Sequence, residues 1–317
     1  MPRSLNTLMT DLIDYAGLFP PAKLSMPAAV EAYNRARIGE HEWMLGRFVC
    51  PISRLEEFGR AAAPLLPGTN ASSGYRPMGD AAGPWRLTVL MDGDDRESDL
   101  AEIEGFNDHH AEPDNGLAKI DMCEIKVAEV GEIDDWLDDI PEDVYPFFEF
   151  PIGPDGSATD CRGFVAALSG NAAAAKVRTG GITANAFPLP DELAAFLHAC
   201  AATDVPFKAT AGLHHAVRGP HRLTYEKDAP TAPMHGFLNL FIAAAICRAM
   251  RPDRAVTLAI LSGEEPAEFK FSADVLAWRE HLLAVTDVAR VREAFALSFG
   301  SCSFDEPIEE LKAMGLL

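Results

Sequence analysis

A chain of 317 residues, 48% of them hydrophobic, can bury a large core and has the length of a (β/α)8 barrel that folds as one unit. Its 48 acidic residues against 27 lysines and arginines give a net charge of −21. This balance excludes the basic face that nucleic-acid binding needs and opposes docking on anionic membranes. We interpret the acidic surplus as a solvated surface.

The six cysteines indicate a reducing compartment. They stand at positions 50, 123, 161, 200, 247 and 302 without a CxxC pair, several of them in apolar surroundings. Residues 1–6 lack the apolar core of a signal peptide. The longest apolar run, 237–247, contains Asn239 and is too short to span a bilayer. We therefore expect a cytoplasmic protein with free thiols.

The first 42 residues predict helices. Apolar residues at positions 5, 8, 9, 12 and 13 share one helical face, and a second helix is expected at about 27–38. We interpret residues 1–42 as an N-terminal helical extension of the domain. Between the two helices, the run from Asp14-Tyr15 to Pro20-Pro21 is expected to cap the bottom of the fold. The alternative is that this run reaches the active site.

From residue 43 to residue 317, short apolar strands alternate with helices. The expected strands are 46–51, 85–91, 121–127, 144–151, 173–178, 205–210, 269–273 and 296–304. Residues 67–84, rich in Gly, Pro and Ser, predict a long surface loop. Eight strands alternating with helices predict a closed (β/α)8 barrel of the TIM type. An open nucleotide-binding sheet is the rival, but no GxGxxG or GxxxxGK[ST] follows any strand.

Charged residues occupy the ends of four successive apolar strands. Side chains alternate along a strand, so residues two apart share a face. The pairs that share a face are Glu124 with Lys126, Phe147 with Glu149, Lys176 with Arg178, and Lys208 with Thr210. Because the C-terminal ends of barrel strands face one mouth, we predict that Lys126, Glu149, Lys176 and Lys208 converge there as catalytic side chains. The alternative is a set of buried ion pairs, or a register shifted by one residue.

Two histidines and several small residues follow these strands. His214 and His215 are candidates for a general acid or base, an anion donor or a metal ligand, and we expect at most one to point inward. The alternative is a pair of ordinary loop histidines.

Arg178 beside Gly180-Gly181 predicts a carboxylate or phosphate site, to which Gly300-Ser301 can add backbone donors. The alternative for both glycine turns is a purely structural role. Thr210 is expected to position a substrate hydroxyl or a water molecule.

The run Lys208-Ala-Thr210-Ala-Gly212 resembles the Schiff-base segment of the deoxyribose-phosphate-aldolase type of class I aldolase. In that family a strand-six lysine is followed by hydroxyl residues and by a glycine four positions on. The resemblance covers residues 208–212 and implies that Lys208 condenses with a carbonyl group. It also implies a proton-transferring carboxylate on strand four, where Glu149 is the counterpart by strand, and a lysine on strand seven, where Lys270 stands. The histidine pair and the N-terminal segment depart from the family.

Three functions are compatible with these patterns. The first is a Schiff-base lyase that acts without a cofactor on a small carboxylated or phosphorylated carbonyl compound, since burial and a neighbouring cation favour a neutral lysine. The second is a metal-dependent isomerase, lyase or hydrolase, although the chain lacks HxH and HExxH. In it Glu149 and His214 or His215, with Glu124 as a further candidate ligand, bind a divalent ion, and a lysine acts as acid or base. The third is a non-catalytic ligand-binding barrel. The expected partner is a small anion, not nucleic acid or membrane, and the sequence leaves a homo-oligomer open.

Overall fold

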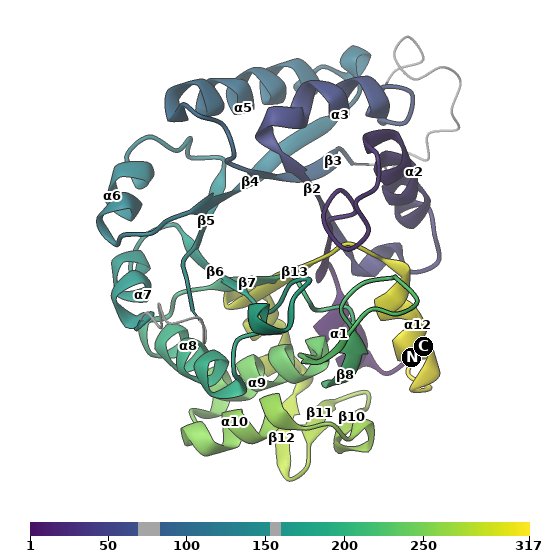
Figure 1. Cartoon of the computed structure of the whole chain (residues 1–317), viewed down its shortest axis with the longest axis vertical. Helices are drawn as coiled ribbons and strands as arrows, with labels where there is room; N and C mark the ends of the chain where they lie inside the picture. Colours follow the sequence, from purple (N-terminus) through teal and green to yellow (C-terminus); the bar gives the residue numbers. More distant parts are fainter. Residues whose placement is uncertain (69–82, 153–159) are drawn as a thin grey trace.

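The computed structural model describes residues 1–68, 83–152 and 160–317. Eight parallel strands close into a barrel, with helices around its outside (Figure 1). Around the barrel the strands follow the order β1-β13-β7-β6-β5-β4-β3-β2. The predicted (β/α)8 architecture is therefore confirmed. Most of the predicted loop at 67–84 lies outside the described residues.

The barrel strands match the predicted pattern at seven of eight places. They are β1 (Ile13–Tyr15), β2 (Leu45–Pro51), β3 (Trp85–Leu90), β4 (Ala118–Lys126), β5 (Tyr145–Glu149), β6 (Ala174–Arg178), β7 (Phe207–Thr210) and β13 (Ala296–Ser301). The described helices are α1 (Arg3–Met9), α2 (Met26–Arg37), α3 (Leu55–Ala62), α5 (Arg96–Ala111), α6 (Gly131–Leu137), α7 (Arg162–Leu168), α8 (Pro190–Thr203), α9 (Phe237–Met250), α10 (Arg254–Ser262), α11 (Val285–Ala294) and α12 (Asp305–Ala313).

The first barrel strand lies inside the segment predicted to be a helical extension. Strand β1 pairs in parallel with β13 on one side and with β2 on the other, so it closes the barrel. The barrel therefore does not begin at residue 43, and that prediction was wrong. Three residues are too few to show strand alternation in a sequence, and the apolar Leu12 and Ile13 continue the helical pattern that precedes them.

The predicted strand at 269–273 does not belong to the barrel. Its residues form β10 (Phe269–Phe271), which pairs antiparallel with β11 (Val275–Trp278), which in turn pairs with β12 (His281–Ala284). Figure 1 shows this small sheet beside α10, outside the barrel. Lys270 is exposed there, away from the barrel mouth. Because β1 is a barrel strand and β10 is not, the position number of every barrel strand between them rises by one relative to the prediction. Lys208 therefore lies on the seventh barrel strand and Lys176 on the sixth.

A hairpin interrupts the connection between β7 and α9. It consists of β8 (Gly219–Arg222) and β9 (Thr231–Met234), paired antiparallel. Leu223, Ala232 and Met234 of the hairpin region pack with Phe187 in an apolar cluster separate from the main core. This second cluster gives the hairpin its own support beside the barrel.

The apolar run at 237–247 is a core helix. Every one of its residues is buried within α9, where Phe241 packs against Phe207 and Phe299 of the barrel. In the parts of the chain that the structure describes, no helix is both long enough and apolar enough to cross a membrane. All six cysteines are buried free thiols, as predicted.

Candidate functional site

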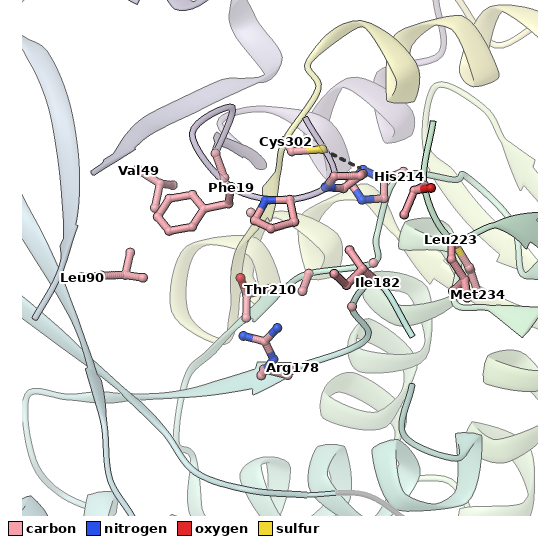
Figure 2. A pocket seen from close by; sticks show the side chains of 18 of the residues that line it. Phe19, Val49, Leu90, Arg178, Ile182, Thr210, His214, Leu223, Met234 and Cys302 are labelled. Atoms are coloured by element: carbon pink, nitrogen blue, oxygen red, sulfur yellow. Dashed lines mark hydrogen bonds between the residues drawn. The ribbon is translucent and has the colours of Figure 1, made fainter. Parts of the chain in front are cut away.

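A cavity of about 680 Å³ opens at the C-terminal ends of the barrel strands (Figure 2). Seven of the eight barrel strands contribute to its lining, and Ala16, directly after β1, completes the ring. The charged residues Glu124, Glu149, Lys176 and Arg178 line this cavity. Ligand sites of barrel proteins occupy this face because the strand ends and the loops that follow them converge there.

A chain of alternating charges runs from the interior of the barrel to this cavity. Its members, in order of contact, are Asp14, Lys208, Glu124, Lys176, Glu149 and Arg178. We call these six residues the charge chain. Each carboxylate in it contacts at least one cation, and the formal charges of the three acids and three bases cancel.

Each of the two lysines in the charge chain binds two carboxylates. Lys208 Nζ lies 2.7 Å from Asp14 Oδ2 and 2.6 Å from Glu124 Oε1. Lys176 Nζ lies 2.6 Å from Glu124 Oε2 and 2.6 Å from Glu149 Oε2. Glu124 therefore bridges the two ammonium groups, while the outer carboxylate, Glu149, lies 3.7 Å from Arg178.

Strand register explains why two lysines can stand side by side. In the parallel pairing of β6 with β7, Lys176 is opposite Lys208, and in the pairing of β5 with β6, Glu149 is opposite Lys176. Two neighbouring ammonium groups would repel each other in a low-dielectric interior. Glu124, which reaches across from β4, contacts both ammonium groups and compensates their repulsion, while Asp14 from β1 contacts Lys208.

Exposure rises along the charge chain. The side chains of Asp14 and Lys208 are 0% and 1% exposed, whereas that of Arg178 is 55% exposed. Asp14 and Lys208 are not among the residues that line the cavity, but Lys176 is. The inner end is therefore sealed, and the outer end faces incoming molecules.

Asp14 is the functional candidate that the sequence did not identify. Its Oδ1 accepts the backbone N–H of Arg47 at 2.8 Å, and its Oδ2 accepts the hydroxyl of Ser298 at 2.7 Å in addition to Lys208. Burial alone would raise the pKa of Asp14, but Lys208 and Arg47 outweigh burial and hold the pKa below its ordinary value. The available signal was one acidic residue between apolar neighbours, Ile13 and Tyr15.

The two central members of the charge chain are both ionised at neutral pH. Burial opposes the charge of Glu124, yet Lys176 and Lys208 hold its pKa at about 2. Burial likewise opposes the charge of Lys176, but Glu124 and Glu149 hold its pKa above the ordinary value. The resting site therefore contains a lysine ammonium group between two carboxylates.

Three of the four side chains predicted to converge at the mouth, Lys126, Glu149 and Lys176, line the cavity. Lys208 is buried beneath it and joins Glu149 and Lys176 in the charge chain. Lys126, at the end of β4, lines the cavity with an exposed side chain. The alternative interpretation as buried ion pairs is correct for Lys208, which does not line the cavity.

Both predicted histidines line the cavity, whereas we expected at most one to face it. His214 Nδ1 lies 3.4 Å from Ser301 Oγ, 3.5 Å from Glu306 Oε2 and 3.9 Å from Cys302 Sγ. Burial, and to a smaller extent His215, lowers the pKa of His214 to about 4. His214 is therefore a neutral hydrogen-bonding residue at physiological pH.

His215 belongs to a different group of side chains. Its Nδ1 lies 2.5 Å from Glu310 Oε1, and its ring stacks on that of His221 with centroids 3.3 Å apart and planes 9° from parallel. These three residues offer ligand atoms that all lie within 4.8 Å of one another. Parallel rings direct their lone pairs along parallel planes, so one ring must rotate before both nitrogens can bind one ion.

The predicted metal-ligand set does not come together. Glu149 binds Lys176, while His214 and His215 face different acidic residues, Glu306 and Glu310. Among the described residues, His215, His221 and Glu310 are the group that could hold a metal ion.

The predicted anion-binding residues divide into two groups. Arg178, Gly181, Thr210 and Gly300 line the cavity. Gly180 and Ser301 are not part of that lining, which favours their structural interpretation: a side chain at Gly180 would collide with the Phe187 ring, and Ser301 Oγ donates a hydrogen bond to the Ser303 carbonyl at 2.6 Å.

The prediction of a cap at the barrel bottom was wrong. Phe19, Pro20 and Pro21, which follow β1, line the cavity at the C-terminal mouth. A parallel barrel strand delivers the residues after it to this face, and once β1 is a barrel strand its loop must lie here. The alternative, a segment that reaches the site, describes the structure.

Comparisons of the chain with protein-family models, with curated proteins and with solved structures give no match. The residues of the site itself provide a buried lysine at the cavity, two carboxylates in contact with the amine of that lysine, and an arginine at the rim.

Proposed function

We propose that this chain is an enzyme that forms a Schiff base between Lys176 and a small anionic carbonyl compound, as a lyase of the aldolase type. The observation that carries the proposal is the difference between the two lysines of the charge chain. Lys176 lines the cavity, whereas Lys208 does not and has a side chain only 1% exposed. A nucleophile has to reach the substrate, so the reactive amine is reassigned from Lys208 to Lys176.

The corrected strand count supports this reassignment. The resemblance to deoxyribose-phosphate-type aldolases falls on residues 208–212 in the sequence, but it requires a lysine on the sixth strand. That lysine is Lys176 on β6, and a hydroxyl residue, Thr179, and a glycine four positions on, Gly180, follow the strand. Glu124 on β4 then corresponds to the strand-four carboxylate, and Lys208 on β7 to the strand-seven lysine.

The proton of Lys176 has a nearby acceptor. Nucleophilic attack needs the neutral amine, and Glu149 Oε2 lies 2.6 Å from Nζ. Glu124 is a weak base, because Lys176 and Lys208 together hold its pKa at about 2. A substrate that displaces water from the cavity favours the neutral amine and acid over the ion pair, since both charges lose hydration.

The same carboxylates stabilise the covalent intermediate. The neutral amine of Lys176 attacks the carbonyl carbon, and one amine proton moves to the carbonyl oxygen to give a carbinolamine. Glu149 then returns the proton that it took, so that the oxygen leaves as water. The iminium cation that results occupies the place of the ammonium group, between Glu124 and Glu149. It withdraws the electron pair of the bond between the α and β carbons; this bond breaks as Glu149, ionised again, accepts the proton of the β-hydroxyl, the β carbon leaves as a carbonyl compound, and an enamine remains on Lys176. Arg178 binds the anionic group of the substrate at the rim.

Borohydride trapping tests the proposal. The protein is incubated with carboxylated and phosphorylated aldehydes and ketones, reduced, and analysed by peptide mass spectrometry. We expect an adduct on the peptide that contains Lys176, its loss in Lys176→Met, and its persistence at a lower rate in Lys208→Met. Circular dichroism checks that both variants fold. An adduct on Lys208, or none with a compound that the enzyme turns over, would falsify the proposal.

A second candidate is a metal-dependent enzyme of the same barrel. The observation that favours it is the group of His215, His221 and Glu310, of which both histidines line the cavity. In that case a chelator abolishes turnover and no borohydride adduct forms. A ligand-binding barrel without catalysis would bind the same compounds without either result.

A further inference from the structure

The lining of the cavity is divided between charge and apolar surface. The charged part contains the outer four members of the charge chain, Glu124, Lys176, Glu149 and Arg178, and four further charged residues, Asp92, Lys126, Arg222 and Glu306. The other part, which we call the apolar wall, carries only hydrocarbon, aromatic and thioether side chains. Its members are Phe19, Pro20, Pro21, Val49, Leu90, Met91, Ile182, Leu223 and Met234.

The apolar wall has two halves that come from distant parts of the chain. Phe19, Val49 and Leu90 come from the loop after β1 and from strands β2 and β3, while Leu223 and Met234 come from the hairpin region. Figure 2 shows the two halves on opposite sides of the cavity, with Thr210 and Arg178 between them. A ligand held by Arg178 thus has apolar surface on both sides.

Part of the apolar wall is open to solvent. Ile182 is 48% exposed and lines the cavity. Leu223 and Met234 belong to the hairpin cluster, so that cluster borders the cavity directly. Apolar side chains around an open cavity are typical of ligand sites, where an apolar ligand group removes them from water.

The volume is also larger than a small polar metabolite needs. Cavities of about 300–1,000 Å³ enclose ligands of drug size, and this one measures about 680 Å³. A three- or four-carbon acid would leave the apolar wall in contact with water.

We infer that the substrate is an amphipathic acid, in which a carboxylate and a neighbouring carbonyl face Arg178 and Lys176 and an apolar chain or ring contacts the apolar wall. The carbonyl in this description rests on the proposed function, but the apolar group does not. Arg178 Nη1 and Lys176 Nζ both contact Glu149, at 3.7 and 2.6 Å, so the carboxylate and the carbonyl can be close neighbours in the substrate.

Titration calorimetry on the full chain tests the inference. Straight-chain 2-hydroxy acids of three to eight carbons cannot form a Schiff base, so they report non-covalent recognition alone. We expect affinity to rise by about threefold to fourfold for each added methylene group, with an increasingly negative heat-capacity change. Affinity that is independent of chain length would overturn the inference.

A pair of exposed residues provides a matched control. Ile182 lies at the cavity, whereas Leu282, 59% exposed on β12, is outside its lining. Ile182→Ser is expected to weaken binding of the eight-carbon acid by about fivefold and to leave the three-carbon acid unchanged, while Leu282→Ser changes neither. An equal loss in both variants would show non-specific adsorption and overturn the inference.

The two proposals fail separately. Chain-length-dependent affinity without a borohydride adduct supports the amphipathic ligand and refutes the Schiff base. An adduct with short substrates, combined with affinity that ignores chain length, refutes the amphipathic ligand and supports the Schiff base.

Discussion

The two lysines of the charge chain have nearly identical contacts and different surroundings. Each ammonium group lies between two carboxylates at 2.6–2.7 Å. Yet Lys208 is sealed with Asp14 inside the barrel, while Lys176 borders a cavity. An ion pair therefore does not by itself define the role of a buried lysine. On our proposal, access to ligand separates the amine that reacts, Lys176, from Lys208, which holds its neighbours in place.

The largest expected effect concerns the outer carboxylate. Glu149→Gln removes the acceptor of the Lys176 proton, so borohydride-trapped adduct should form about 10²–10⁴ times more slowly. Quench-flow trapping with mass spectrometry measures this rate. Glu142→Gln, at an exposed glutamate, serves as the control and should keep the parent rate. An unchanged rate in Glu149→Gln would mean that another group takes the proton.

At the sealed end we expect an effect on stability. Lys208→Met leaves Asp14 without its main cation inside the barrel and should lower the free energy of unfolding by about 3–5 kcal/mol. Lys176→Met should have a smaller effect, about 1–3 kcal/mol, because Glu149 borders the cavity and lies near Arg178. Denaturant titration measures both, with exposed Lys126→Met as the control. A larger loss for Lys176→Met would reverse the assignment of roles.

Acid should lower the free energy of unfolding over a defined range of pH, because carboxylates of the charge chain become protonated. The pKa of Glu124 is about 2 in the folded protein, against roughly 4.3 for a free glutamate. A depressed carboxyl pKa stabilises the fold above the unfolded pKa, and this contribution, about 3 kcal/mol, disappears as pH falls from about 5 to 2. Asp14, whose pKa is also lowered, acts in the same direction. Unfolding curves at each pH measure the slope, which should flatten in Glu124→Gln; an equal slope there would assign the effect to other acids.

Chelation should have the smallest effect. If Lys176 is the reactive amine, treatment with a chelator leaves adduct formation unchanged, because no step assigned to Lys176, Glu149 or Arg178 needs a metal ion. His215→Asn, which removes one ligand of the possible metal group, should do the same. Loss of turnover in both experiments, together with no borohydride adduct in the untreated protein, would favour the metal-dependent alternative.

The sequence predicted the barrel and four members of the charge chain, Glu149, Lys176, Arg178 and Lys208, because both predictions depend on local pattern. Alternation placed Glu149, Lys176 and Lys208 on inward faces at strand ends, and the register confirms this placement. The position of each strand in the barrel could not be obtained from local pattern. Strand β1 has three residues, and its pairing partner β13 begins at Ala296, so only tertiary structure reveals that Asp14 belongs to the site.

The division of the cavity lining also lies beyond the sequence. Phe19 and Leu223 are ordinary apolar residues in their own segments, and no local pattern relates them. Their common position follows from closure of the barrel and from the hairpin after β7. The alternation of side chains along a strand can locate charged residues at a barrel mouth. The shape of the opening depends on loops whose paths the sequence does not specify.

Closure of the barrel by β1 also has a consequence for synthesis on the ribosome. Strand β1 emerges before the other barrel strands, but β13, its hydrogen-bonding neighbour on one side, emerges about 280 residues later. Lys208, the cation that pairs with Asp14, follows Asp14 by 194 residues. Until those segments emerge, β1 has one unpaired edge and a carboxylate without its lysine. The first barrel strand to be made is thus among the last to reach its final contacts.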